Sequence, residues 1–174
     1  MIVQQAIEQA SKILKKNNIL SHELDAELIL SDIMNIKKEL LIIKNKAIVP
    51  EKIIKKYKVA INRRIKSEPV AYILGKKEFW SENFIVNHST LVPRPETELM
   101  LYKLIKFFKN KKINILDIGT GSGCILLSIL KELNFAGGIG IDFSPKAIKT
   151  AKETVENNFI TKLNEELSQL DEQI

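Results

Sequence analysis

The feature that most constrains the fold is a run of alternating glycines, DIGTGSG at residues 117–123, set between two apolar segments. Residues 113–117 are short and apolar and are predicted to form a buried strand, whereas the longer stretch 124–133 is predicted to be a helix. Glycines let the backbone turn sharply from a strand into a helix and let a ligand approach it. A second strand is predicted at 139–142, followed by a helix that Ser144 and Pro145 begin. This order predicts an α/β fold, the first part of a doubly wound Rossmann-like domain.

The spacing of the glycines and the placement of two acids indicate the class of ligand. The loop is G-x-G-x-G, not the G-x-G-x-x-G that holds a dinucleotide pyrophosphate, and Asp117 lies two residues before the first glycine. S-adenosylmethionine has no phosphate, and its methionine part carries an ammonium group. An acid at this position can bind that ammonium group. Asp142 ends the second predicted strand, where doubly wound folds place an acid that binds ribose hydroxyls. A lone glycine loop could be only a tight turn, but the two acids favour S-adenosylmethionine.

Residues 1–74 show helical rather than strand periodicity. Apolar residues recur at helical spacing over 3–14, 24–33, 38–44 and 54–65, with Ser21 as a candidate N-cap. These apolar stripes need one another for burial, so a small helical bundle is predicted. The pattern changes at Gly75: residues 78–80 and 84–86 are predicted strands of a hairpin linker over 75–92. A helix at about 96–109 then begins a ligand-binding domain that we assign to 93–174.

Composition excludes several classes of protein. No apolar run approaches the roughly 20 residues that span a bilayer, so we expect no membrane segment. The single cysteine rules out an internal disulfide framework and is typical of a reducing cytoplasm. With His22 and His88 as the two histidines, no His/Cys metal cluster is expected. The net charge of +6 permits nucleic-acid contact, but the lysines are scattered without aromatic neighbours, so we interpret them as a solvated surface and expect no direct nucleic-acid binding.

Three motifs occur in a distinctive order: LVPRPETE (91–98), ILDIGTGSGC (115–124) and IDFSPKAI (141–148). They resemble the bacterial release factor glutamine methyltransferases, the PrmC/HemK family. GKKEFWSENFIVN (75–87) resembles the hairpin linker of that family, and the helical segment resembles its small substrate-recognition bundle. The resemblance extends to about residue 158. It implies methyl transfer from S-adenosylmethionine to a glutamine in the Gly-Gly-Gln loop of peptide-chain release factors.

The resemblance also assigns site residues by position. It implies that the cofactor is lined by Gly119, Thr120, Gly121, Ser122 and Gly123, and that Asp142 binds its ribose. Arg94 and Thr97 lie in the segment that runs beside the cofactor pocket in the family.

The sequence departs from the family pattern after residue 158. Residues 1–174 contain no Asn-Pro-Pro-Tyr run, the loop that positions the acceptor amide in the family, so no catalytic residue is assigned. Only two parallel strands are predicted, and we expect a truncated, impaired methyltransferase. A non-catalytic remnant or binding module, and a nucleic-acid methyltransferase or front part of a fused enzyme, remain as alternatives. The stretch 161–174 is expected to be an acidic amphipathic helix of unassigned role, and no pattern indicates an oligomeric state.

Overall fold

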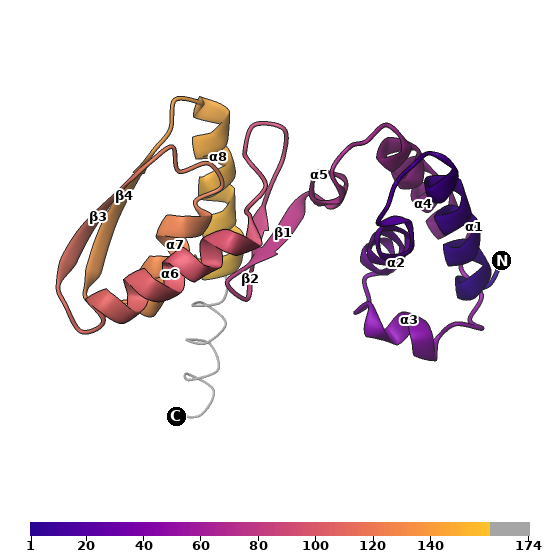
Figure 1. Cartoon of the computed structure of the whole chain (residues 1–174), viewed down its shortest axis with the longest axis horizontal. Helices are drawn as coiled ribbons and strands as arrows, with labels where there is room; N and C mark the ends of the chain where they lie inside the picture. Colours follow the sequence, from indigo (N-terminus) through magenta and orange to yellow (C-terminus); the bar gives the residue numbers. More distant parts are fainter. Residues whose placement is uncertain (161–174) are drawn as a thin grey trace. The chain divides into compact units, whose positions relative to one another are not determined.

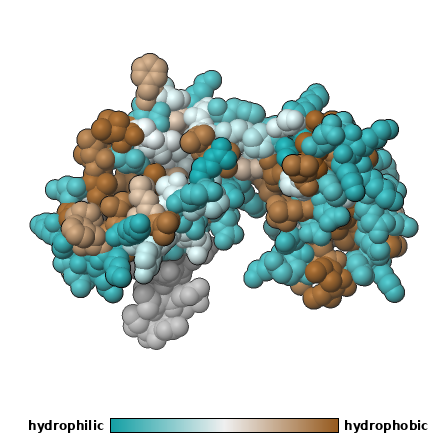
Figure 2. All heavy atoms as spheres, in the orientation of Figure 1, coloured by the Kyte–Doolittle hydropathy of each residue, from teal (hydrophilic) through white to brown (hydrophobic). Residues whose placement is uncertain are grey.

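The computed structural model describes residues 1–160 of the chain. They divide between two compact units, Met1–Leu74 and Gly75–Ile174, the first helical and the second containing both sheets (Figure 1). Hydrophobic and hydrophilic side chains both reach the surface of each unit (Figure 2). The predicted acidic helix at 161–174 lies outside the described residues. No helix among residues 1–160 is both long and apolar enough to cross a membrane.

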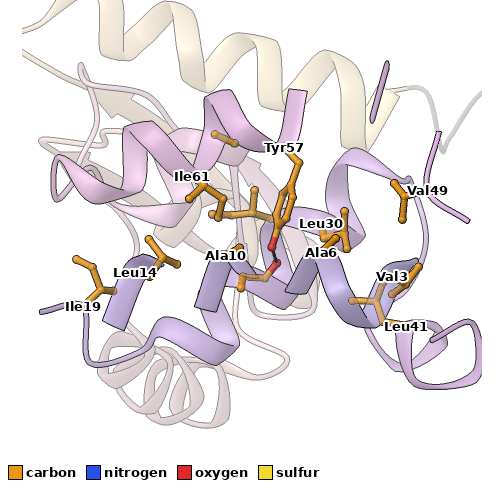
Figure 3. Close-up of a cluster of buried hydrophobic side chains, with 13 residues drawn as sticks. Val3, Ala6, Ala10, Leu14, Ile19, Leu30, Leu41, Val49, Tyr57 and Ile61 are labelled. Carbon is orange, nitrogen blue, oxygen red and sulfur yellow. Dashed lines mark hydrogen bonds between the residues drawn. The ribbon is translucent and has the colours of Figure 1, made fainter. Parts of the chain in front are cut away.

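The first unit is built from helices that share one hydrophobic core. Its elements are α1 (Val3–Lys16), α2 (His22–Ile33), α3 (Glu39–Ile43), α4 (Glu51–Ile65) and α5 (Val70–Leu74). Figure 3 shows the side chains of α1, α2 and α4 pointing toward one another, with Leu14, Leu30 and Tyr57 among them. Leu14 and Leu30 are 0% exposed. The helical bundle predicted from the apolar stripes is confirmed, with α5 as an additional short helix after Pro69.

Polar groups inside the first unit are paired. The Tyr57 hydroxyl donates to the backbone oxygen of Ala26 at 2.9 Å, and burial raises the pKa of that hydroxyl. Asp25 is 5% exposed and accepts from Arg64 Nε at 2.7 Å and from Ser21 Oγ at 2.8 Å. Ser21 occupies the N-cap position of α2 as predicted, but its hydroxyl donates to the Asp25 side chain and makes no hydrogen bond to the backbone of the helix. The buried Asp25 carboxylate therefore accepts two hydrogen bonds, one of them from a cation, which offsets the cost of burying its charge.

The second unit begins with an antiparallel hairpin, β1 (Lys76–Phe79) and β2 (Glu82–Ile85). Each strand starts two residues and ends one residue earlier than predicted. The turn is Trp80–Ser81, where φ is +51° and +58°, and not residues 81–83. Positive φ at both central residues is typical of a type I′ turn, whose backbone twist matches that of the two flanking strands. Trp80 then donates from its backbone to Glu98 and from its indole to Glu132, both at 2.9 Å, so the hairpin packs within this unit.

A parallel two-stranded sheet forms the rest of the second unit. The elements after the hairpin are α6 (Pro95–Phe108), β3 (Ile113–Ile118), α7 (Cys124–Glu132), β4 (Ala136–Ile141), α8 (Pro145–Thr154) and the π-helical turn η1 (Val155–Ile160). The predicted α/β class and the strand–helix order are confirmed. β4 starts three residues earlier than predicted, because its first three residues are an alanine and two glycines, which are too small to signal a strand. Gly137 and Gly138 nevertheless pair with Asn114 and Ile115 of β3.

The two faces of the parallel sheet are covered unequally. α7 packs against one face, where a Cβ atom at Gly138 would lie 2.5 Å from Leu126 Cδ1, so a side chain there would have to displace the end of this leucine. The other face carries a row of apolar side chains that are 45–75% exposed: Leu116, Ile118, Ile139 and Ile141. Figure 2 shows hydrophobic atoms gathered at the surface of this unit. Parallel sheets are normally covered on both faces, so half of this one lacks a layer within the described residues.

Candidate functional site

The glycine loop follows β3 and is attached to the end of β4. The two strands run parallel with Ile118 beside Ile141, so their carboxyl ends meet at one edge of the sheet. The backbone amides of Gly119 and Thr120 both donate to the backbone oxygen of Ile141, at 2.8 and 3.0 Å. This backbone oxygen fixes the loop at the point where Asp142 leaves the strand.

Three glycines of the loop have positive φ, for two different physical reasons. Gly119, Gly121 and Gly123 have φ of +79°, +57° and +78°. A Cβ atom would meet nothing within 4 Å at Gly119 and only a backbone oxygen at 3.9 Å at Gly121, so these two present open backbone. At Gly123 a Cβ atom would lie 3.0 Å from Leu127 Cδ1, so this glycine serves the packing of α7. The open backbone of Gly119 and Gly121 leaves the space that a ligand beside the loop needs.

The two acids predicted for the site both bind the loop. Asp117 Oδ2 accepts from the Thr120 hydroxyl at 2.8 Å. Asp142 Oδ2 accepts from the backbone amide of Gly121 at 2.9 Å, and its Oδ1 from that of Ser144 at 2.8 Å. The amides of Ser144 and Gly121 lower the pKa of Asp142 below its usual range, which keeps it ionised at neutral pH. A carboxylate offers about four acceptor positions, so each acid can accept from a further donor.

The hydroxyl side chains of the loop point into the unit. Thr120 is 8% exposed and Ser122 is 2% exposed. Within residues 1–160, the Ser122 hydroxyl is buried without a hydrogen-bond partner. The prediction that all five loop residues line a ligand therefore becomes more specific: the open side of the loop is backbone, and these two side chains lie behind it.

The remaining predicted residues are not joined to the loop. Arg94 is exposed and stands at the N-cap of α6, and the Thr97 amide donates to its backbone oxygen at 3.0 Å. Within the described part of the chain, neither side chain forms a hydrogen bond or ion pair with the loop. Burial raises the pKa of the Cys124 thiol, which disfavours a nucleophilic thiolate. No group of three or more potential metal ligands occurs among residues 1–160.

Sequence reasoning missed two parts of the site. The Ile141 backbone oxygen has no signature in the sequence, because any residue carries one. Gly140 had a weak signal, its alternation with Gly138 on one face of β4, and a Cβ atom there would lie 2.8 Å from Thr120 Oγ1. A side chain at position 140 would therefore displace the loop threonine.

Two family models match the chain, one in each unit. Residues 5–75 match the PrmC N-terminal domain, and residues 109–172 match a methyltransferase domain. The release factor glutamine methyltransferase of Buchnera aphidicola is 38% identical over 128 residues, covering 74% of this chain and 46% of that protein. The enzyme of the same name from Bradyrhizobium diazoefficiens is 36% identical over 156 residues, covering 85% and 52%.

A second kind of relative carries a different name. The bifunctional methyltransferase of Rickettsia typhi is 35% identical over 176 residues, covering 90% of this chain and 34% of that protein. The chain thus spans about a third to a half of the length of these curated relatives. The two domain matches and the relatives place this chain in the release factor glutamine methyltransferase (PrmC) family.

Proposed function

We propose that the chain binds S-adenosylmethionine at the glycine loop and forms the cofactor-binding part of a methyltransferase. The observation that carries this proposal is the hydrogen bond from the Gly121 amide to Asp142, which connects the end of β4 to the open glycine backbone that follows Asp117. When bound, S-adenosylmethionine supplies an activated methyl group. The residues of this chain would bind and orient it and would not themselves exchange protons with it.

The chemistry of the two acids fits the two ends of this ligand. The carboxylate of Asp117 is a partner for the ammonium group of the methionine part, and that of Asp142 is an acceptor for the ribose hydroxyls. Gly119 and Gly121 allow the ligand to lie against the backbone between them. Each acid would thus hold one end of the molecule, with the loop between them.

The methyl acceptor that we propose is the side-chain amide of the glutamine in the Gly-Gly-Gln loop of release factors. Support comes from the relatives named release factor glutamine methyltransferases and from the PrmC domain match over residues 5–75. We assign the helical unit to recognition of this substrate. Residues 1–174 contain no Asn-Pro-Pro-Tyr run to hold the amide, so we expect them to transfer the methyl group slowly at most.

Cofactor binding is tested by calorimetry with S-adenosylhomocysteine, the product that has lost the methyl group. We expect saturable binding to the full chain. Replacing Asp142 by Ala should weaken it by about 1–3 kcal/mol, the scale of charge-assisted hydrogen bonds. Asp32→Asn in α2 is the control, because it removes an acid from the helical unit, and it should leave the affinity unchanged. Equal affinity of Asp142→Ala and the unaltered chain would remove the ribose role of Asp142.

The acceptor is tested with labelled S-adenosylmethionine and a bacterial release factor. We expect slow incorporation that disappears when the glutamine of the Gly-Gly-Gln loop is replaced by Ala. Incorporation that persists in that variant would place the acceptor elsewhere. Incorporation into RNA or DNA under the same conditions would instead support the nucleic-acid methyltransferase.

A further inference from the structure

The side chain of Thr120 lies behind the open backbone of the loop, and its hydroxyl has a defined hydrogen-bond partner. It is 8% exposed, between the open glycines on either side. Its hydroxyl donates to Asp117 Oδ2 at 2.8 Å, and its backbone amide donates to the Ile141 oxygen at 3.0 Å. Both hydrogen bonds join Thr120 to other residues of the second unit. Its side chain therefore stabilises the loop from behind and is not part of the exposed face of the loop.

The space for this side chain is made by a glycine in the neighbouring strand. A Cβ atom at Gly140 would lie 2.8 Å from Thr120 Oγ1, 3.1 Å from its Cβ and 3.2 Å from its Cγ2. Thr120 is therefore packed directly against the backbone of β4. A β-branched side chain has few rotamers, and in the one it adopts beside Gly140 its hydroxyl donates to Asp117.

The consequence concerns the orientation of the Asp117 carboxylate. One accepted hydrogen bond from a buried donor restrains the Oδ2 oxygen of Asp117 and leaves its other acceptor positions for a cation. A carboxylate that is oriented before the ligand arrives does not have to be ordered on binding.

We propose that Thr120 is a positioning residue that orients the Asp117 carboxylate for the ammonium group of S-adenosylmethionine. This inference rests on the proposed function, since it assigns a support to one end of the same ligand. Thr120 does not touch the ligand through its side chain. It sets the affinity for the amino-acid end and leaves the nucleoside end, held by Asp142, unaffected.

The two ends can be separated with two ligands. S-adenosylhomocysteine carries the ammonium group, and 5′-methylthioadenosine lacks the amino-acid part but keeps the nucleoside. Thr120→Val keeps the shape of the side chain and removes the donor, whereas Thr120→Ser keeps the donor. Thr120→Ala removes the donor with a smaller side chain, which guards against a valine that does not pack.

Calorimetry on the full chain measures the affinity of each variant for both ligands. We expect Thr120→Val and Thr120→Ala to bind S-adenosylhomocysteine about tenfold more weakly, a factor that corresponds to about 1.4 kcal/mol. Their affinity for 5′-methylthioadenosine should stay within about twofold, and Thr120→Ser should restore S-adenosylhomocysteine binding to within about threefold. A loop that was merely destabilised would lose both ligands together.

Two results would overturn the inference while leaving the proposed function intact. One is an equal loss of both ligands in Thr120→Val and Thr120→Ala, which would make Thr120 a structural residue only. The other is unchanged S-adenosylhomocysteine affinity in both variants. Absence of binding by the unaltered chain would overturn the proposed function, and the inference with it.

Discussion

The two units bury their apolar residues to very different extents. In the helical unit, Leu14 on α1 and Leu30 on α2 are both 0% exposed. In the sheet unit, Leu116 is 59% exposed and Ile139 is 66% exposed, although each lies inside a strand of the parallel sheet and pairs with the other. Helices with one apolar stripe can bury these stripes against one another in a small bundle. A parallel strand has two apolar faces and needs a packed layer on each of them. Within residues 75–160, the second unit therefore has the site geometry without the full packing of a parallel sheet.

The largest expected effect comes from deleting a buried side chain in the helical unit. Leu14→Ala should lower the free energy of unfolding by about 2–5 kcal/mol, because it leaves a cavity in a closed core. Leu116→Ala is the matched change in the sheet unit, and we expect about 1 kcal/mol or less, since that leucine is already largely in water. Urea unfolding measures both. Trp80 fluorescence follows the second unit alone, whereas circular dichroism follows the helices of both units, so a transition seen by circular dichroism and not by Trp80 belongs to the helical unit. Equal losses would contradict the comparison.

The covered face of the sheet should respond differently from the bare face. Gly138→Ala places a Cβ atom 2.5 Å from Leu126 Cδ1, so α7 or the leucine must shift. Overpacking of this kind costs about 1–3 kcal/mol. Trp80 fluorescence during urea unfolding reports this loss, because the indole bonds to Glu132 at the end of α7. A variant as stable as the unaltered chain would show that the end of Leu126 moves aside without loss of packing between α7 and β4.

On the bare face, a polar replacement should have little effect. Ile139→Thr keeps the β-branched shape of a residue that is 66% exposed, and we expect a change within about 0.5 kcal/mol. The same urea experiment measures it, with Ile29→Thr, at a position that is 0% exposed in the helical unit, as the contrast. A large loss for Ile139→Thr would mean that this face is covered in solution.

The smallest expected effect is the titration of Asp142. The amides of Ser144 and Gly121 lower its pKa, so their hydrogen bonds are present above the unfolded value of about 3.9 and are lost as the pH falls through the folded value. The amide proton shifts of Gly121 and Ser144, followed by NMR, should therefore move with a midpoint below about 3.9. Asp142→Asn should abolish this movement. A midpoint at or above about 3.9 would contradict the hydrogen bonds at Asp142.

Periodicity and local motifs predicted much of this architecture. The apolar stripe of α1 and the strand–glycine–helix order around Gly119 depend on neighbours in sequence, and both predictions were confirmed. The first residues of β4 and the hairpin register were misplaced, because Gly137 resembles a loop residue and the turn at Trp80 has no glycine or asparagine to mark it. The hydrogen bond from Thr120 to Asp117, and the Gly140 contact behind it, depend on the packing of β4 against the loop, which no local pattern encodes.

The central claim is that the second unit, and not the helical unit, binds the methyl donor. Hydrogen exchange followed by mass spectrometry, with and without saturating S-adenosylhomocysteine, tests this most directly in the full chain. The account predicts slower exchange in peptides that contain residues 117–123 and 142–144, with residues 3–65 unchanged. Protection confined to the helical unit, or no protection anywhere, would contradict it.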